Sequence, residues 1–133
     1  MLDRKSNPIF VIQKHYASHL HFDLRLQRGD VLKSWVVVKE PPAQPGIKRL
    51  AIQVEDHELD YAGFEGKIAE GLYGAGEVKI WDNGYYKNVK FEKNEIIVEL
   101  MGSRLKGVYC LIKLKPKAEK DKNWLFFKKK RLT

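Results

Sequence analysis

Three of the four histidines in this chain, His15, His19 and His21, fall within one short stretch, and Asp23 and Arg25 follow at two-residue spacing. On a β-strand, residues two apart share a face and lie about 6.6 Å apart along the backbone. His21 and Asp23 can therefore converge on one ion, with Arg25 continuing the row. A turn would bring His15 back to the same place. Two imidazoles and a carboxylate form a mixed nitrogen–oxygen site that suits Mn, Fe or Zn.

Other polar residues supply what a metal-assisted reaction on phosphate would need. A bound metal polarises a phosphoryl oxygen and acidifies water, and the planar fork of Arg25 matches two phosphate oxygens. His57 follows Gln53 and Glu55 in an alternating strand pattern, and an imidazole pKa of about 6.5 suits it to protonate a leaving alkoxide. We expect Tyr61 to orient the phosphate or His57. Gln53 and Glu55, expected on the strand face of His57, are candidates for sensing a 2′-hydroxyl, which distinguishes RNA from DNA.

Other interpretations of these residues remain open. The alternation over Leu20–Gln27 would arise on any amphipathic edge strand. His21, Asp23 and His57 also match the ligand set of a 2-His-1-carboxylate iron oxygenase, which would leave His15 without a role. A nucleic-acid-binding barrel without catalysis is a third possibility. The glycine-rich stretch 71–76 lacks the lysine and hydroxyl residue of a P-loop, so its glycines are interpreted as turn residues.

Composition indicates one globular domain with a basic surface. The chain has 133 residues and a net charge of +8, which favours nucleic acid as a partner. No apolar run is long enough to span a membrane, and no signal peptide is recognisable, so we expect a cytoplasmic monomer with no membrane partner. Cys110 lies in an apolar run and is interpreted as a buried structural residue in a reducing compartment.

Period-two patterns predict an all-β fold, an antiparallel closed or partly open β-barrel of about eight strands with minor helical turns. The strand candidates are 9–14, 20–27, 31–39, 49–57, 77–81, 85–91, 95–101, 108–115 and 124–129. Asp82-Asn83-Gly84 is a strong hairpin signal. Residues 61–76 are expected to form a long loop, and 16–19 or 41–48 a helical turn. The basic run 128–131 is expected to be a solvated tail.

The string His15-x-Ala17-x-x-Leu20-His21-x-Asp23-x-Arg25-Leu26 resembles the signature of the 3′-phosphoesterase domain of ligase D, the bacterial and archaeal end-joining DNA ligase. The resemblance continues through 34–39, 54–57, 61–66, 71–78, 81–84, 105–107 and 124–125, and so covers roughly residues 10 to 128. The 133 residues contain no polymerase or ligase segment. We therefore expect a stand-alone, single 3′-phosphoesterase domain over 1–133.

The resemblance implies a barrel with a metal site in an open groove. It implies manganese, with other divalent transition metals as alternatives, bound by His15, His21 and Asp23. It implies that the phosphate is held or acted on by Arg25, His57 and Tyr61, with Glu55 at a further functional position. The implied activity removes a 3′-terminal ribonucleoside and then the resulting 3′-phosphate. The implied partners are the 3′ end of a primer-template and separate ligase or end-joining proteins. His19 falls at a variable position and is expected at the surface.

Overall fold

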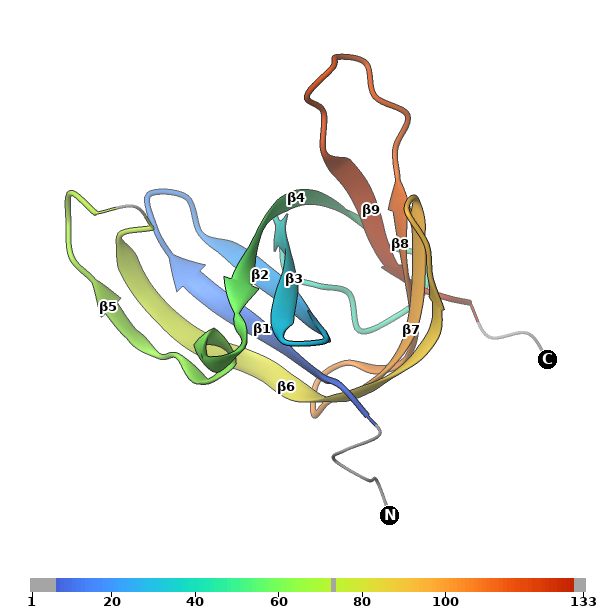
Figure 1. Cartoon of the computed structure of the whole chain (residues 1–133), viewed down its shortest axis with the longest axis horizontal. Coiled ribbons are helices and arrows are strands. Elements are labelled where there is room, and N and C mark those ends of the chain that lie inside the picture. Colours follow the sequence, from blue (N-terminus) through green and yellow to red (C-terminus); the bar gives the residue numbers. More distant parts are fainter. Residues whose placement is uncertain (1–6, 73, 131–133) are drawn as a thin grey trace.

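A computed structural model describes residues 7–72 and 74–130, and this part of the chain is almost entirely β-structure (Figure 1). It contains nine strands and one short 3-10 helix, η1. The elements are β1 (Ile9–Tyr16), β2 (His21–Arg28), β3 (Val31–Val37), β4 (Lys48–Glu58), η1 (Leu59–Gly63), β5 (Gly66–Ile68), β6 (Gly76–Phe91), β7 (Glu95–Met101), β8 (Lys106–Lys113) and β9 (Asn123–Lys128). Within the described residues, no helix is long and apolar enough to cross a membrane.

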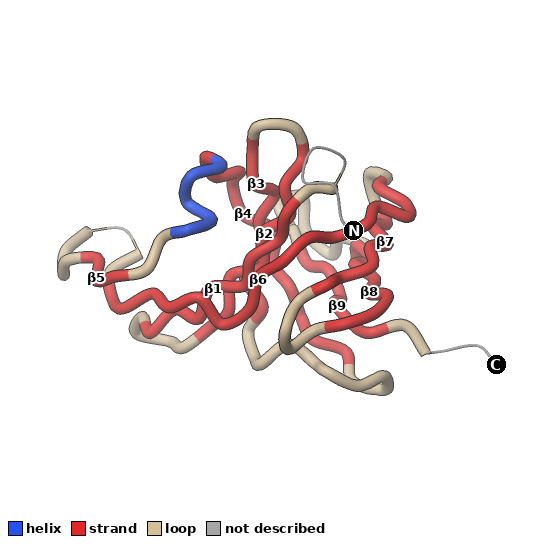
Figure 2. The backbone as a smooth tube through the Cα atoms, turned by 90° about the horizontal axis from the view of Figure 1, so that it is seen from below, coloured by secondary structure: helices blue, strands red, loops and turns tan. Residues whose placement is uncertain are grey.

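Eight of the strands close into an antiparallel barrel, which confirms the predicted fold class. The strand order is β1-β2-β3-β4-β9-β8-β7-β6-β5, and a further pairing between β1 and β6 closes the circle. β5 therefore extends the sheet beyond the barrel, paired with the first residues of β6. Figures 1 and 2 both show β5 and η1 on the side of the barrel away from β7, β8 and β9.

The hydrophobic core takes alternate residues from the strands, because successive side chains on a strand point to opposite faces. Trp35 and Trp124 meet edge to face with their ring centroids 5.7 Å apart, and both are buried. Cys110 is buried and free, as predicted. On β2, the residues that belong to this core are Phe22, Leu24 and Leu26. The intervening polar residues of β2 must therefore face the opposite side of the sheet.

The predicted hairpin at Asp82-Asn83-Gly84 is wrong, because β6 runs through these residues without a break. They pair with β1, where Gly84 lies opposite Phe10. The glycine is required by close packing: a Cβ atom on Gly84 would lie 2.2 Å from the carbonyl oxygen of Met101. Asp82 is buried, and its carboxylate accepts hydrogen bonds from backbone N–H groups of the turn between β7 and β8.

The segment predicted as one long loop also contains regular structure. η1 and β5 both overlap 61–76, whereas neither 16–19 nor 41–48 is helical. Gly71, Gly74 and Gly76 all have positive φ, which agrees with their interpretation as turn residues. Tyr73 of this stretch, Arg131 of the basic tail and residues 1–6 lie outside the described part of the chain.

Candidate active site

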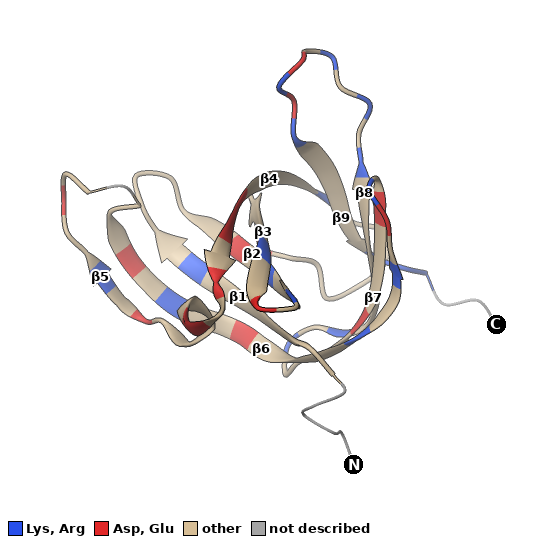
Figure 3. Ribbon diagram, in the orientation of Figure 1, with Lys and Arg blue, Asp and Glu red and all other residues tan. Residues whose placement is uncertain are grey.

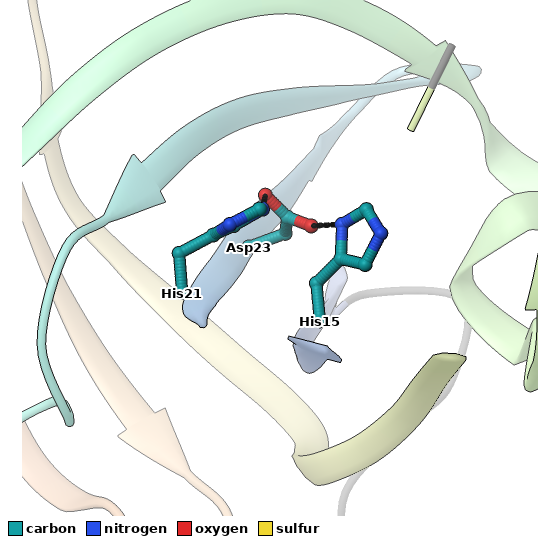
Figure 4. Close-up of side chains that lie close together, drawn as sticks. All are labelled: His15, His21 and Asp23. Carbon is teal, nitrogen blue, oxygen red and sulfur yellow. Dashed lines mark ion pairs between the residues drawn. The ribbon is translucent and has the colours of Figure 1, made fainter. Parts of the chain in front are cut away.

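The antiparallel pairing of β1 with β2 brings the three predicted metal ligands together. His15 lies directly opposite His21 in the register, and their ring centroids are 4.7 Å apart. The Asp23 carboxylate lies 3.5 Å from His15 Nδ1 and 3.4 Å from His21 Nε2 (Figure 4). One ligand atom from each residue lies within 4.8 Å of the others. This spacing allows all three side chains to bind one ion.

Backbone carbonyls orient both imidazoles of this cluster. His21 Nδ1 lies 2.9 Å from the carbonyl oxygen of His19, and His15 Nε2 lies 2.8 Å from that of Gly74. A carbonyl only accepts hydrogen bonds, so each of these nitrogens carries the proton, and the other nitrogen of a neutral ring presents a lone pair. Those lone pairs, on His21 Nε2 and His15 Nδ1, face Asp23.

With both rings neutral, two lone pairs and a carboxylate form a donor set for a cation, so this cluster can bind a metal. The pKa of His21 also indicates that this cluster favours positive charge. When His21 is protonated, Nε2 can donate to Asp23, and this hydrogen bond is the main reason that the pKa of His21 is raised despite the opposing effect of burial. In the protein alone, positive charge is therefore favoured at this point.

Arg25 is buried beside the cluster, and two polar side chains fix its guanidinium. Arg25 Nε donates to Gln13 Oε1 at 2.7 Å, and Nη1 donates to Ser34 Oγ at 2.8 Å. Arg25 Nη2 lies 3.8 Å from the carboxylate of Asp23. Burial is the main cause of a lowered pKa of Arg25, although an arginine remains protonated in proteins. These contacts therefore hold the positive charge of Arg25 beside the cluster of His15, His21 and Asp23.

Gln13 and Ser34 were not predicted to belong to the site. Gln13 is fully buried, and its amide nitrogen also donates to the carbonyl oxygens of Tyr61 and Phe64. Gln13 therefore connects Arg25 to η1 and the residue that follows it. The alternation along β1 could have indicated Gln13, because Gln13 lies two residues before His15 and therefore on the same face of the strand. Ser34 lies opposite Arg25 in the β2–β3 pairing, but that register is not visible in the sequence.

η1 brings Tyr61 over the site, where its ring contacts His57 and Arg25. The His57 and Tyr61 rings stack with their centroids 4.5 Å apart, and the Arg25 guanidinium carbon lies 4.9 Å from the Tyr61 centroid. Burial, followed by the positive charge of Arg25, lowers the pKa of His57. His57 is therefore mainly neutral near pH 7 in the free protein.

The expectation that Gln53 and Glu55 share a strand face with His57 is wrong. The β3–β4 pairing shifts register, with Ser34 opposite Val54 but Leu32 opposite His57. This bulge breaks the period of two, so Val54 lines the same pocket as His57. Gln53 instead lines a separate hollow with Trp35, and Glu55 is exposed. A function for Glu55 stays a prediction. His19 is exposed, as predicted.

The predicted metal ligands, Arg25, His57 and Tyr61 line one pocket of about 530 Å³. It lies on the face of β2 opposite the hydrophobic core. Its polar lining combines a mixed nitrogen–oxygen cluster, a buried arginine and an imidazole. These groups can bind a cation, bind an anion beside it and transfer a proton. Fold and site together therefore define a β-barrel protein whose pocket places a candidate metal cluster, a buried arginine and an imidazole side by side.

Comparison with known proteins agrees with this class. The family model of the DNA ligase D 3′-phosphoesterase domain matches residues 13–113. The chain is 50% identical over 108 residues, 78% of its length, to the multifunctional non-homologous end joining protein LigD of Mycobacterium bovis. It is 44% identical to the LigD proteins of Pseudomonas aeruginosa, over 91% of the chain, and of Mycolicibacterium smegmatis, over 90%. The chain belongs to the DNA ligase D 3′-phosphoesterase domain family. The matches cover 14%, 15% and 16% of these three relatives.

Proposed function

We propose that this protein is a metal-dependent phosphoesterase that repairs the 3′ ends of DNA and RNA strands. It removes a 3′-terminal ribonucleoside as a phosphodiesterase and then removes the remaining 3′-phosphate as a phosphomonoesterase. The observation that carries the proposal is the pocket, in which a cluster of two histidines and an aspartate lies beside a fixed arginine and a third imidazole. Family membership supports the phosphoesterase class.

The proposed metal ligands are His15, His21 and Asp23, with manganese as the expected ion and other divalent transition metals as alternatives. When bound, the ion would polarise a phosphoryl oxygen and lower the pKa of a coordinated water. The iron-oxygenase ligand set is not favoured, because the cluster found among the described residues contains His15 and not His57.

Arg25 is proposed to bind the scissile phosphate. Gln13 and Ser34 occupy only part of its N–H groups, so others remain to donate to phosphate oxygens. Because the fork is already ordered before substrate binds, little reorganisation accompanies the reaction. Burial between the strands also strengthens the attraction between the guanidinium and the phosphate.

His57 is proposed to protonate the leaving oxygen in both reactions. In the first, a water oxygen bonds to phosphorus, the bond to the O5′ of the terminal ribonucleoside breaks, and that O5′ takes a proton. In the second, water again bonds to phosphorus, and the bond to the O3′ of the strand breaks. Tyr61 stacks on the His57 ring and is proposed to hold it in place. The lowered pKa of His57 makes its protonated form a stronger acid.

The proposed partner is the 3′ end of a nucleic-acid strand paired to a template. Figure 3 shows Lys and Arg interspersed with Asp and Glu over the strands, and the connection between β8 and β9 carries four lysines together with Glu119 and Asp121. With a net charge of +8, the surface would attract phosphate backbones over a distance set by ionic strength. Ligase or other end-joining proteins are proposed as separate partners, and the protein is proposed to act as a monomer.

Three matched primers test the proposal, with and without Mn²⁺. They end in a ribonucleoside, in a deoxyribonucleoside and in a 3′-phosphate. We expect trimming of the ribonucleoside end, release of phosphate from the third primer, and slow attack on the all-deoxy end. Equal digestion of all three that continues inward would indicate an unselective exonuclease. Binding of all three without turnover would favour the non-catalytic barrel.

A further inference from the structure

The active-site pocket also has apolar lining that hydrolysis of a phosphate does not require. Four large apolar side chains, here called the apolar wall, line it: Val36, Val54, Ile68 and Leu72. They come from β3, β4, β5 and the loop before β6. A phosphate, a metal and water are all polar, so none of them needs such a wall. At about 530 Å³, the pocket has the size of sites that bind whole small molecules.

Leu72 is the most exposed member of the wall, with 62% of its surface accessible. Its position is set by the backbone on both sides. Its N–H donates to the carbonyl oxygen of Ala69 at 3.2 Å, and its own carbonyl accepts from the N–H of Ala75 at 3.1 Å. These two hydrogen bonds place an apolar side chain at the edge of the pocket.

The loop that carries Leu72 is also attached to the metal cluster. The carbonyl oxygen of Gly74 accepts from His15. A Cβ atom on Gly74 would lie 3.7 Å from the His15 ring and 3.8 Å from the Ile68 side chain. Gly74, two residues after Leu72, therefore packs between a proposed metal ligand and a member of the apolar wall.

We propose that the apolar wall binds the nucleobase of the departing 3′-terminal ribonucleoside, which leaves the base stack and enters the pocket. This inference rests on the proposed function. With the phosphate at Arg25 and His57, the base is the large, flat and weakly polar group attached to it through the ribose. Nucleobases taken out of a stack are commonly held against apolar and aromatic side chains.

The proposal separates the two reactions. In the phosphodiesterase step, a nucleoside lies beyond the scissile phosphate and its base contacts the wall. In the phosphomonoesterase step, no nucleoside remains there. Leu72 therefore determines the preference for a ribonucleoside end over a 3′-phosphate end, and the ratio of the two activities reports its contribution.

The test compares Leu72→Ala with Val89→Ala. Val89 is an apolar residue of similar exposure (58%) on β6, and it does not line this pocket. The ratio of kcat/KM for the ribonucleoside-ended primer to kcat/KM for the 3′-phosphate primer is expected to fall about tenfold in Leu72→Ala. It is expected to stay unchanged in Val89→Ala. A primer ending in an abasic ribose should lower the wild-type rate by a similar factor, and Leu72→Ala should add no further loss on that primer.

A binding measurement without divalent metal provides a second readout. A primer whose terminal ribonucleoside carries 2-aminopurine is expected to become more fluorescent on binding the wild-type protein, because the base unstacks, and less so on binding Leu72→Ala. Unchanged fluorescence, or equal loss of both activities in Leu72→Ala, would overturn the inference while leaving the phosphoesterase assignment intact. Failure of the wild-type protein to hydrolyse either primer would instead refute the proposed function, and the fluorescence would still report on the wall.

Discussion

Replacement of Arg25 by lysine separates the charge of this residue from its geometry. Arg25→Lys keeps one positive charge but replaces a planar fork with a single ammonium group. In the structure, the guanidinium donates through two different nitrogens, to Gln13 at 2.7 Å and to Ser34 at 2.8 Å. The ammonium group has three N–H donors on a single nitrogen, so it lacks the planar geometry that reaches both acceptors and leaves other donors for a phosphate.

The loss can be estimated from those contacts. A hydrogen bond to a charged group contributes about 1.5–3 kcal/mol, and we expect lysine to keep only one of the two. Ser34 Oγ also donates to the carbonyl oxygen of Leu32, so the Oε1 of Gln13, which is fully buried, is the acceptor left without a partner. We expect the free energy of unfolding to fall by about 2 kcal/mol, which corresponds to a decrease in Tm of roughly 6–10 °C for a domain of this size.

The expected loss of activity is larger than the loss of stability. Removing one preorganised donor from a developing oxyanion typically reduces kcat by about 10²–10³. Thermal unfolding followed by circular dichroism measures the first quantity, and steady-state release of phosphate from a 3′-phosphate primer measures the second. Assays at a temperature well below both Tm values keep the two effects apart.

Arg28→Lys is the matched control on the same strand. Arg28 is exposed, and its guanidinium carbon lies 4.0 Å from the Phe91 ring centroid, a contact worth about 0.5–1 kcal/mol at exposed sites. We expect a small change in Tm and none in turnover. If Arg25→Lys matched this control in both measurements, Arg25 would be only a screening charge, and the argument from its hydrogen bonds would be refuted.

The metal cluster, His57 and Asp82 each lead to a further measurable expectation. Alanine at His15, His21 or Asp23 should lower the Mn²⁺ affinity measured by titration calorimetry at least about a hundredfold, with the circular dichroism spectrum unchanged. Wild-type affinity in all three variants would refute the assignment of these residues as metal ligands. Because the pKa of His57 is lowered, this pKa lies below the ordinary imidazole value of 6.5. If His57 is the general acid, kcat/KM should fall as the pH rises through that pKa. If the His57→Ala variant showed the same fall of kcat/KM with pH, the fall would belong to another group. Asp82→Ala leaves the buried N–H of Leu105 and that of Ser103 without their acceptor and should cost about 2–4 kcal/mol in urea unfolding, whereas an unchanged midpoint would show that the turn does not depend on this carboxylate.

Local alternation in the sequence was enough to predict the barrel class and the side of β2 that carries the site. With Leu24 and its apolar neighbours in the core, His21, Asp23 and Arg25 had to share the other face, because strand side chains alternate. The sequence did not show that this other face is also covered. His15 and Asp23 are buried there, with η1 and β5 on the same side of the barrel.

Only the tertiary structure decided the features that depend on contacts between distant segments. Register between β1 and β2 placed His15 opposite His21, and closure of the barrel made Gly84 a packing residue rather than a turn residue. The bulge in β4 brought His57 into the pocket and left Glu55 at the surface. A period of two is a property of each strand alone, whereas register, bulges and closure depend on which strands pair and where. That pairing is set by the packing of the whole barrel, so no single stretch of this sequence encodes it.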